Sequence, residues 1–193
     1  MQYAFTAQIQ TQKGEKIMSK LNQIDKAAES KGSLLVTVWQ FVKFIVVSLL
    51  AMIVQFVLLN TLQLIPAIKE LYTQDFNWLF FAYPVAVGGL GYFIVSNVAN
   101  IIAQIVAFFV NKEKTFNSGA NVAVALPIYI AFTIGLIVFS AWLNPTLKDL
   151  FVGYNLGEAA AKNIATMICS AVQFFLYFPV DKILFHKKKE DKE

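Results

Sequence analysis

Four long stretches without a charged residue dominate this 193-residue sequence and limit what it can fold into. They cover residues 44–68, 76–111, 115–147 and 163–180. A helix needs roughly 17–25 mostly apolar residues to cross a bilayer, and each stretch meets that requirement. Hydrophobic residues make up 58% of the chain, more than the roughly 45–50% of an ordinary soluble domain. The sequence therefore predicts an all-α, polytopic membrane protein whose four transmembrane helices lie near 41–65, 88–111, 120–143 and 163–184.

The flanking segments divide the chain into an N-terminal part, 1–38, a transmembrane domain, 39–185, and a basic tail, 186–193. Residues 13–18, when back-translated with A-rich codons, contain a pattern like a ribosome-binding site just before Met18. We therefore hypothesise that residues 1–17 do not belong to the natural protein. Apolar Leu21, Ile24 and Ala28 recur at helical spacing, which fits an interfacial helix, and a flexible tail is an equal alternative.

The lysines are distributed unequally between the two sides of the predicted membrane domain. The chain has 16 lysines and no arginine, and four crossings leave only Lys69, Lys148 and Lys162 on the second side. Positively charged short loops stay in the cytoplasm, so both termini and the central loop are expected inside. Basic residues beside membrane spans also explain the net charge of +4 without nucleic acid.

Two short patterns recur at matching positions and suggest that the domain contains two copies of one helical hairpin. Residues 66–71 and 145–150 both read Pro-x-aliphatic-Lys-acid-Leu, and proline there is expected to end a span. Residues 110–112, followed by Phe116, resemble residues 180–182, followed by Phe185. Two crossings return the chain to the same side, so the copies would be parallel repeats related by an axis along the membrane normal.

Polar side chains follow one face of each even-numbered span. In the second span these are Asn97, Asn100, Gln104 and Asn111, and in the fourth Thr166, Ser170, Gln173, Tyr177 and Asp181. Polar groups are costly in hydrocarbon unless they find partners. Two interpretations stay open, because the faces either form hydrogen bonds between helices or line a polar cavity.

Charged residues at the predicted cytoplasmic helix ends add a second part to the candidate site. Lys43, Lys112 and Lys182 lie at one predicted depth and suit an anionic headgroup such as phosphate, and for Lys43 alone simple membrane anchoring is an equal alternative. Asp181 is either the ion-pair partner of Lys182 or a group that exchanges protons during transport. Lone Cys169 and His186 offer no metal-ligand spacing, and we expect no enzyme active site, metal or cofactor.

Lys43-Phe44, the helix end at residues 107–116 and its echo at residues 178–185 resemble the GtrA-like family of small four-helix membrane proteins. The family's second helix ends in a pattern close to Asn-Phe-x-x-Asn-Arg-x-Trp-x-Phe. Phe108, Asn111 and Phe116 match this pattern, Lys112 replaces the arginine, and Ala107 and Lys114 replace the first asparagine and the tryptophan. The resemblance covers about residues 40–185.

This resemblance implies translocation of an undecaprenyl-phosphate-linked sugar across the bacterial cytoplasmic membrane for envelope polysaccharide or teichoic acid glycosylation. Membrane glycosyltransferases would be partners, and the small interior of four helices suggests a dimer or higher homo-oligomer. The expected lipid-phosphate and sugar site comprises Lys43, Asn100, Gln104, Asn111, Lys112, Gln173, Tyr177, Asp181 and Lys182. Two alternatives stay open, a non-transporting scaffold for a glycosyltransferase and a flippase of bare undecaprenyl phosphate. Small multidrug exporters use an acid deep in the first span, which is absent from 44–68.

Overall fold

The computed structural model describes residue 14 and residues 19–186, so the hypothesis for residues 1–17, apart from residue 14, and the basic tail beyond His186 lie outside the described residues. The chain divides into two units, residues 1–43 and 44–193. In the first unit residues 19–30 are helical, which matches the helical alternative for this segment. Asp25 of this helix binds Lys43 Nζ at 2.9 Å and accepts a hydrogen bond from Trp39 Nε1.

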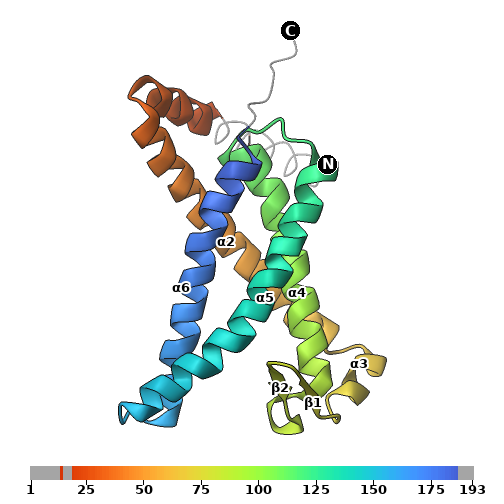
Figure 1. The fold of residues 1–193 in the computed structure, drawn as a ribbon. Helices are drawn as coiled ribbons and strands as arrows, with labels where there is room; N and C mark the ends of the chain where they lie inside the picture. Colours follow the sequence, from red (N-terminus) through yellow and green to blue (C-terminus); the bar gives the residue numbers. More distant parts are fainter. Residues whose placement is uncertain (1–13, 15–18, 187–193) are drawn as a thin grey trace, which may run out of the picture. The chain divides into compact units, whose positions relative to one another are not determined.

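Four helices are long and apolar enough to cross a membrane, which confirms the coarse prediction of a helical multi-pass protein. They are α2 (Ser33–Leu62), α4 (Gly89–Val110), α5 (Val122–Gly153) and α6 (Glu158–Leu184). Figure 1 shows the ends of α4 and α6 close to the start of α5, whereas at the opposite end α4 lies apart from α5 and α6, which a short turn joins. Side chains of α4, α5 and α6 can therefore all meet at the first of these ends, which we call the convergent end.

The third long helix continues ten residues beyond its predicted end near residue 143. Pro145 lies inside α5 instead of ending it. Proline cannot donate a backbone hydrogen bond, so the helix loses one bond of its ladder at this position. Pro66 does behave as a boundary residue, because it begins the short helix α3 (Pro66–Leu71) after α2 has ended.

A small β-hairpin lies between α3 and α4. Strands β1 (Phe76–Trp78) and β2 (Phe81–Tyr83) pair antiparallel and are followed by the 3₁₀ turn η1 (Val85–Val87). The hairpin packs on α4, where the rings of Phe76 and Phe93 lie 4.3 Å apart. Burial, and next the nearby Tyr92, raises the pKa of Tyr83, as expected for a phenol held in this packing.

The first turn of α4 contacts the chain that precedes the hairpin at very short range. Gly89 has a φ of 53°, and a β-carbon at this position would lie 2.2 Å from the carbonyl oxygen of Gln74. The Leu90 backbone N–H donates to the same carbonyl at 2.8 Å. Glycine is therefore required here both by the backbone conformation and by the close approach.

Small residues also let α2 and α4 pack closely further along the bundle. Val47 and Ala51 of α2 form a buried cluster with Ala103 and Ala107 of α4. Short side chains on facing helices are the usual means of close approach in a membrane bundle. This cluster holds the two helices together directly beside the polar residues described below.

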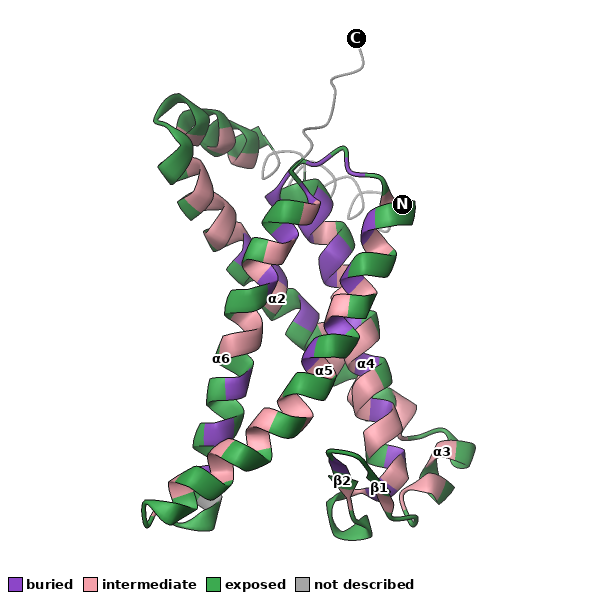
Figure 2. Cartoon of the chain, in the orientation of Figure 1, coloured by how far each residue is buried: buried purple, intermediate pink, exposed green. Residues whose placement is uncertain are grey.

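The last turn of the second span changes from α-helix to π-helix. Segment η2 (Asn111–Thr115) follows α4 without a break, and Asn111, Lys112 and Thr115 are buried in it. Figure 2 shows that buried residues gather around this segment and the adjoining end of α6. Short π-helical turns are uncommon and often occur at functional sites, so this end of the bundle is the first place to look for one.

Candidate functional site

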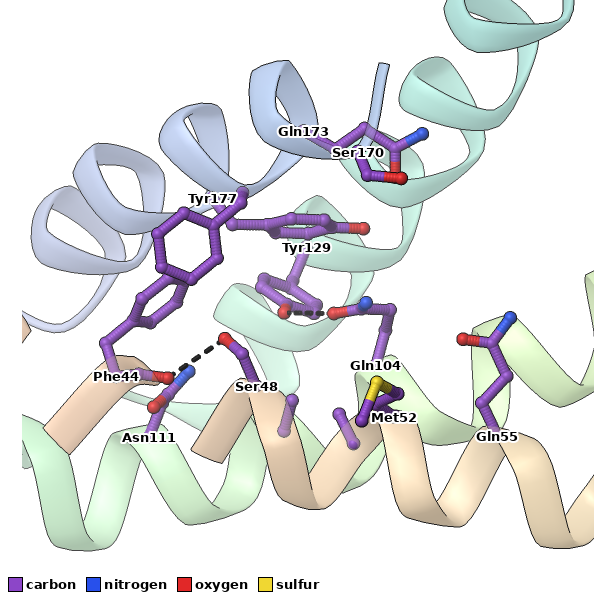
Figure 3. A pocket seen from close by; sticks show the side chains of 13 residues that line it. Phe44, Ser48, Met52, Gln55, Gln104, Asn111, Tyr129, Ser170, Gln173 and Tyr177 are labelled. Carbon is purple, nitrogen blue, oxygen red and sulfur yellow. Dashed lines mark hydrogen bonds between the residues drawn. The ribbon is translucent and has the colours of Figure 1, made fainter. Parts of the chain in front are cut away.

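A cavity of about 160 Å³ lies among the four long helices, close to the convergent end. Figure 3 shows side chains from α2, α4, α5 and α6 pointing toward it. Its lining is rich in uncharged polar groups, which are Ser48, Gln55, Gln104, Asn111, Tyr129, Ser170, Gln173 and Tyr177. Amide and hydroxyl groups can both donate and accept hydrogen bonds, so this lining suits a ligand with many hydroxyl groups.

Hydrogen bonds between helices fix several of these side chains in place. Tyr129 of α5 donates to Gln104 Oε1 of α4 at 3.0 Å, as drawn in Figure 3. Tyr177 of α6 donates to Thr133 Oγ1 of α5 at 3.1 Å, and Gln173 Nε2 donates to Ser140 Oγ. The two interpretations of the polar faces thus do not exclude each other, because the same residues join helices and line the cavity.

A second polar cluster lies at the π-helical turn and joins the two even-numbered spans. Asn111 Nδ2 donates to Asp181 Oδ2 at 2.7 Å, and Thr115 Oγ1 donates to Asn111 Oδ1 at 2.9 Å. Asn111, Thr115 and Asp181 are each at most 1% exposed. Among the described residues, Asp181 Oδ1 is the one buried side-chain nitrogen or oxygen without a hydrogen-bond partner.

Aromatic rings surround this cluster in a reciprocal arrangement. The ring of Phe108 lies 5.1 Å from that of Phe185, and the ring of Phe116 lies 6.2 Å from that of Phe178. Phe108 and Phe178 each precede the central polar residue by three positions, and Phe116 and Phe185 each follow it. Each pair therefore joins one half of the sequence echo to the other half, as Asn111 and Asp181 do.

The three predicted lysines differ in their surroundings. Lys43 belongs to the N-terminal unit, where it forms an ion pair with Asp25 and lies over the Trp39 ring at 5.9 Å. Lys112 is buried in the π-helical turn and lies 3.5 Å from Glu113, whereas Lys182 is exposed. The sequence analysis allowed simple anchoring for Lys43, and the structure adds that Lys112 is buried and adjoins Asn111, which lines the cavity.

The remaining predicted residues separate into two groups. The residues that line the cavity are Gln104, Asn111, Gln173 and Tyr177. Asp181 is not among the lining residues, but it accepts a hydrogen bond from Asn111. Asn100 is half-buried and is not among the lining residues, although it lies one turn from Gln104. Of these two predicted amides on α4, Gln104 therefore belongs to the candidate site and Asn100 does not.

Sequence reasoning missed the contribution of the odd-numbered spans. Tyr129, Thr133 and Ser140 are separated by four and seven residues and lie along one face of α5, where they accept or donate the hydrogen bonds just described. Ser48 and Gln55 are separated by seven residues on α2 and both line the cavity. The same helical spacing that identified the even-numbered faces was present here as well.

In comparisons with known proteins, no family model, curated protein or solved structure matches this chain. The resemblance to the GtrA-like family therefore rests on the motif residues alone.

Proposed function

We propose that this protein moves an undecaprenyl-phosphate-linked sugar from the cytoplasmic to the outer leaflet of a bacterial cytoplasmic membrane. The observation that carries the proposal is the cavity among four membrane-length helices, lined by amides and hydroxyls. A sugar presents hydroxyl groups that such a lining can bind, and the exposed apolar faces of the helices suit a polyprenyl chain. Envelope glycosylation by a membrane glycosyltransferase would use the translocated sugar.

The phosphate of this lipid would bind beside the π-helical turn. Lys112 contributes a buried positive charge next to Asn111, which lines the cavity. A charged hydrogen bond to phosphate is stronger than a neutral one, especially where water is partly excluded. Lys182 would add a more exposed positive charge from α6.

The proposed orientation places both termini and the lysine-rich turn at 112–114 in the cytoplasm. The hairpin at 76–83 and the turn at 154–157 would then lie outside. The two hairpins would be parallel copies, and the reciprocal Phe108–Phe185 and Phe116–Phe178 contacts support a two-fold relation between them. Because the cavity within one chain is small, the working form would be a dimer or higher homo-oligomer.

Translocation can be measured in vesicles with a fluorescent short-chain polyprenyl phosphosugar and a membrane-impermeant quencher. Gln104→Leu should slow movement at least about tenfold, because it removes a polar contact and leaves the Tyr129 hydroxyl unpaired. Asn100→Leu is the matched control, since Asn100 is not among the lining residues, and it should keep wild-type rates.

The alternatives give different results in the same assay. Equal rates for the two leucine variants would argue against the cavity as the translocation site. A scaffold would show no movement of any lipid while still assembling with a glycosyltransferase. If the protein moves polyprenyl phosphate without a sugar and does not move the sugar-bearing lipid, it would instead be a flippase of bare undecaprenyl phosphate.

A further inference from the structure

Asp181 is a fully buried carboxyl group of which only one oxygen has a hydrogen-bond partner in the described part of the chain. Oδ2 accepts from Asn111 Nδ2 at 2.7 Å, and Oδ1 is left without a partner. Burying an ionised carboxylate without enough hydrogen bonds is costly, and a bound proton removes that cost by neutralising the charge. The unpartnered Oδ1 therefore marks a place where a proton can bind.

The other ionisable groups around Asp181 are tyrosines and lysines, which differ from a carboxyl group in the charge they ordinarily carry near neutral pH. Tyr129 from α5 and Tyr177 from α6 interact with it electrostatically, but phenols ordinarily stay neutral there. Lys112 of η2 follows Asn111, and Lys182 of α6 follows Asp181, so this end of the bundle also has two basic side chains. Residues 44–62 of α2, whose Phe44 ring contacts α6, contain no ionisable side chain.

Asn111 connects this carboxyl group to the cavity. The amide of Asn111 lines the cavity and at the same time donates to Asp181. A carboxylate can only accept hydrogen bonds, whereas a carboxylic acid can also donate one. A change in the protonation of Asp181 must therefore alter the hydrogen bonding of Asn111, and with it the cavity wall.

We propose, resting on the function proposed above, that Asp181 takes up one proton when an anionic lipid phosphate binds in the cavity, so that proton and lipid are carried together. The proton adds to the carboxylate from water and returns to water when the lipid leaves, and no other bond is made or broken. Two like charges close together in a nonpolar interior repel each other strongly, which makes proton uptake and anion binding mutually favourable. Such coupling is reciprocal, so lower pH must tighten binding of the anion.

The test measures binding of a short-chain polyprenyl phosphohexose to the full-length protein in nanodiscs as the pH is raised. This phosphodiester keeps one negative charge throughout, so the ligand itself does not titrate. Wild-type affinity should fall about tenfold per pH unit once Asp181 ionises, because one proton is taken up per ligand. A pH-indicator dye in weakly buffered solution should record the same proton uptake directly.

Substitutions assign the proton to its residue. Asp181→Asn keeps the shape and should bind with an affinity independent of pH, whereas Asp181→Glu should keep the slope. Asp149→Asn removes an exposed acid of α5 and serves as the matched control, which should behave as wild type. If Asp181→Asn does not fold, the wild-type slope and dye signal together with Asp181→Glu still decide the matter.

Different failures have different meanings. Binding without proton uptake, or an unchanged slope in Asp181→Asn, would overturn the coupling and leave the proposed function standing. If the affinity for the polyprenyl phosphohexose depends on sodium concentration and not on pH, the coupled ion is not a proton and the proposal is wrong. Absence of binding by wild type at every pH would refute the phosphate-carrying function itself, and the coupling with it.

Discussion

Lys112 and Lys182 follow the two residues of the buried Asn111–Asp181 pair, yet their environments differ. Lys112 is buried in the π-helical turn, and Lys182 is exposed on α6. A charge–phosphate hydrogen bond contributes about 1.5–3 kcal/mol, and more where solvent screening is weak. Lys112→Gln should therefore weaken binding of the polyprenyl phosphohexose at least about tenfold, whereas Lys182→Gln should have a smaller effect.

Binding to nanodisc-embedded protein checks this difference directly. Arginine at position 112, the residue of the GtrA-like pattern, should preserve affinity because it retains the charge. Lys148→Gln changes a lysine at the far end of α5 and provides the control. Equal losses for Lys112→Gln and Lys148→Gln would mean that these lysines act only as membrane anchors.

At the residue scale, helical spacing predicted most of the polar residues that line the cavity, because a helix brings positions three and four apart to one face. It could not identify the partner of Asp181. Asn111 is distant in sequence, and their contact depends on how α4 and α6 are rotated and on the local change to π-helix. Tyr129 was overlooked because a mid-span tyrosine fits an apolar face equally well until its hydroxyl partner is known.

The N-terminal end of α4 is the element whose packing depends most on a single residue. Gly89→Ala would force a β-carbon against the Gln74 carbonyl and place alanine at a φ of 53°. We expect a loss of about 1–3 kcal/mol of stability from the strained backbone alone, with release of the hairpin from α4. A lower midpoint of thermal unfolding in detergent, followed by circular dichroism, is the measurement.

Gly135 supplies the comparison within the same bundle. It lies inside α5, and a β-carbon there would meet no atom within 4 Å. Gly135→Ala should therefore leave the unfolding midpoint unchanged or raise it, since alanine is favoured over glycine in a helix by about 1 kcal/mol. If both alanine variants unfold alike, the short Gly89–Gln74 approach does not contribute to stability.

At the element scale, the sequence predicted the helices better than their ends. Long uncharged stretches identify spans because the bilayer imposes a local requirement on composition and length. Near Pro145, α5 packs against α6, where Asn144 Nδ2 donates a hydrogen bond to Thr166 Oγ1 at 3.1 Å, and such a contact between helices cannot be read from the sequence around the proline. The hairpin at 76–83 forms against α4 and has no strong signal of its own.

At the scale of the whole molecule, the orientation in the membrane follows from the lysine distribution and can be tested by labelling. In a background in which the buried Cys169 is replaced by alanine, cysteines at Asn77 and Gly153 should react with an impermeant thiol reagent added outside. Both positions are exposed, so reactivity reports the side of the membrane. Mass spectrometry of intact cells after labelling gives the answer.

The choice of the inside position matters for this test. Ser118 lies in the predicted central loop but is 1% exposed, so a cysteine there would stay unreactive on either side. Gly119 is exposed and is the informative position. It should react only after the membrane is permeabilised, and reaction in intact cells would reverse the proposed orientation.

The hydrogen bond between Asn111 and Asp181 joins equivalent positions of the two sequence echoes, and it is chemically unequal. Two identical hairpins that met across a symmetry axis would place two amides or two acids face to face. Because one chain contains both echoes, it can oppose one acid with one amide. The unequal pair therefore has one ionisable group, and the coupling proposed above would carry one proton per chain.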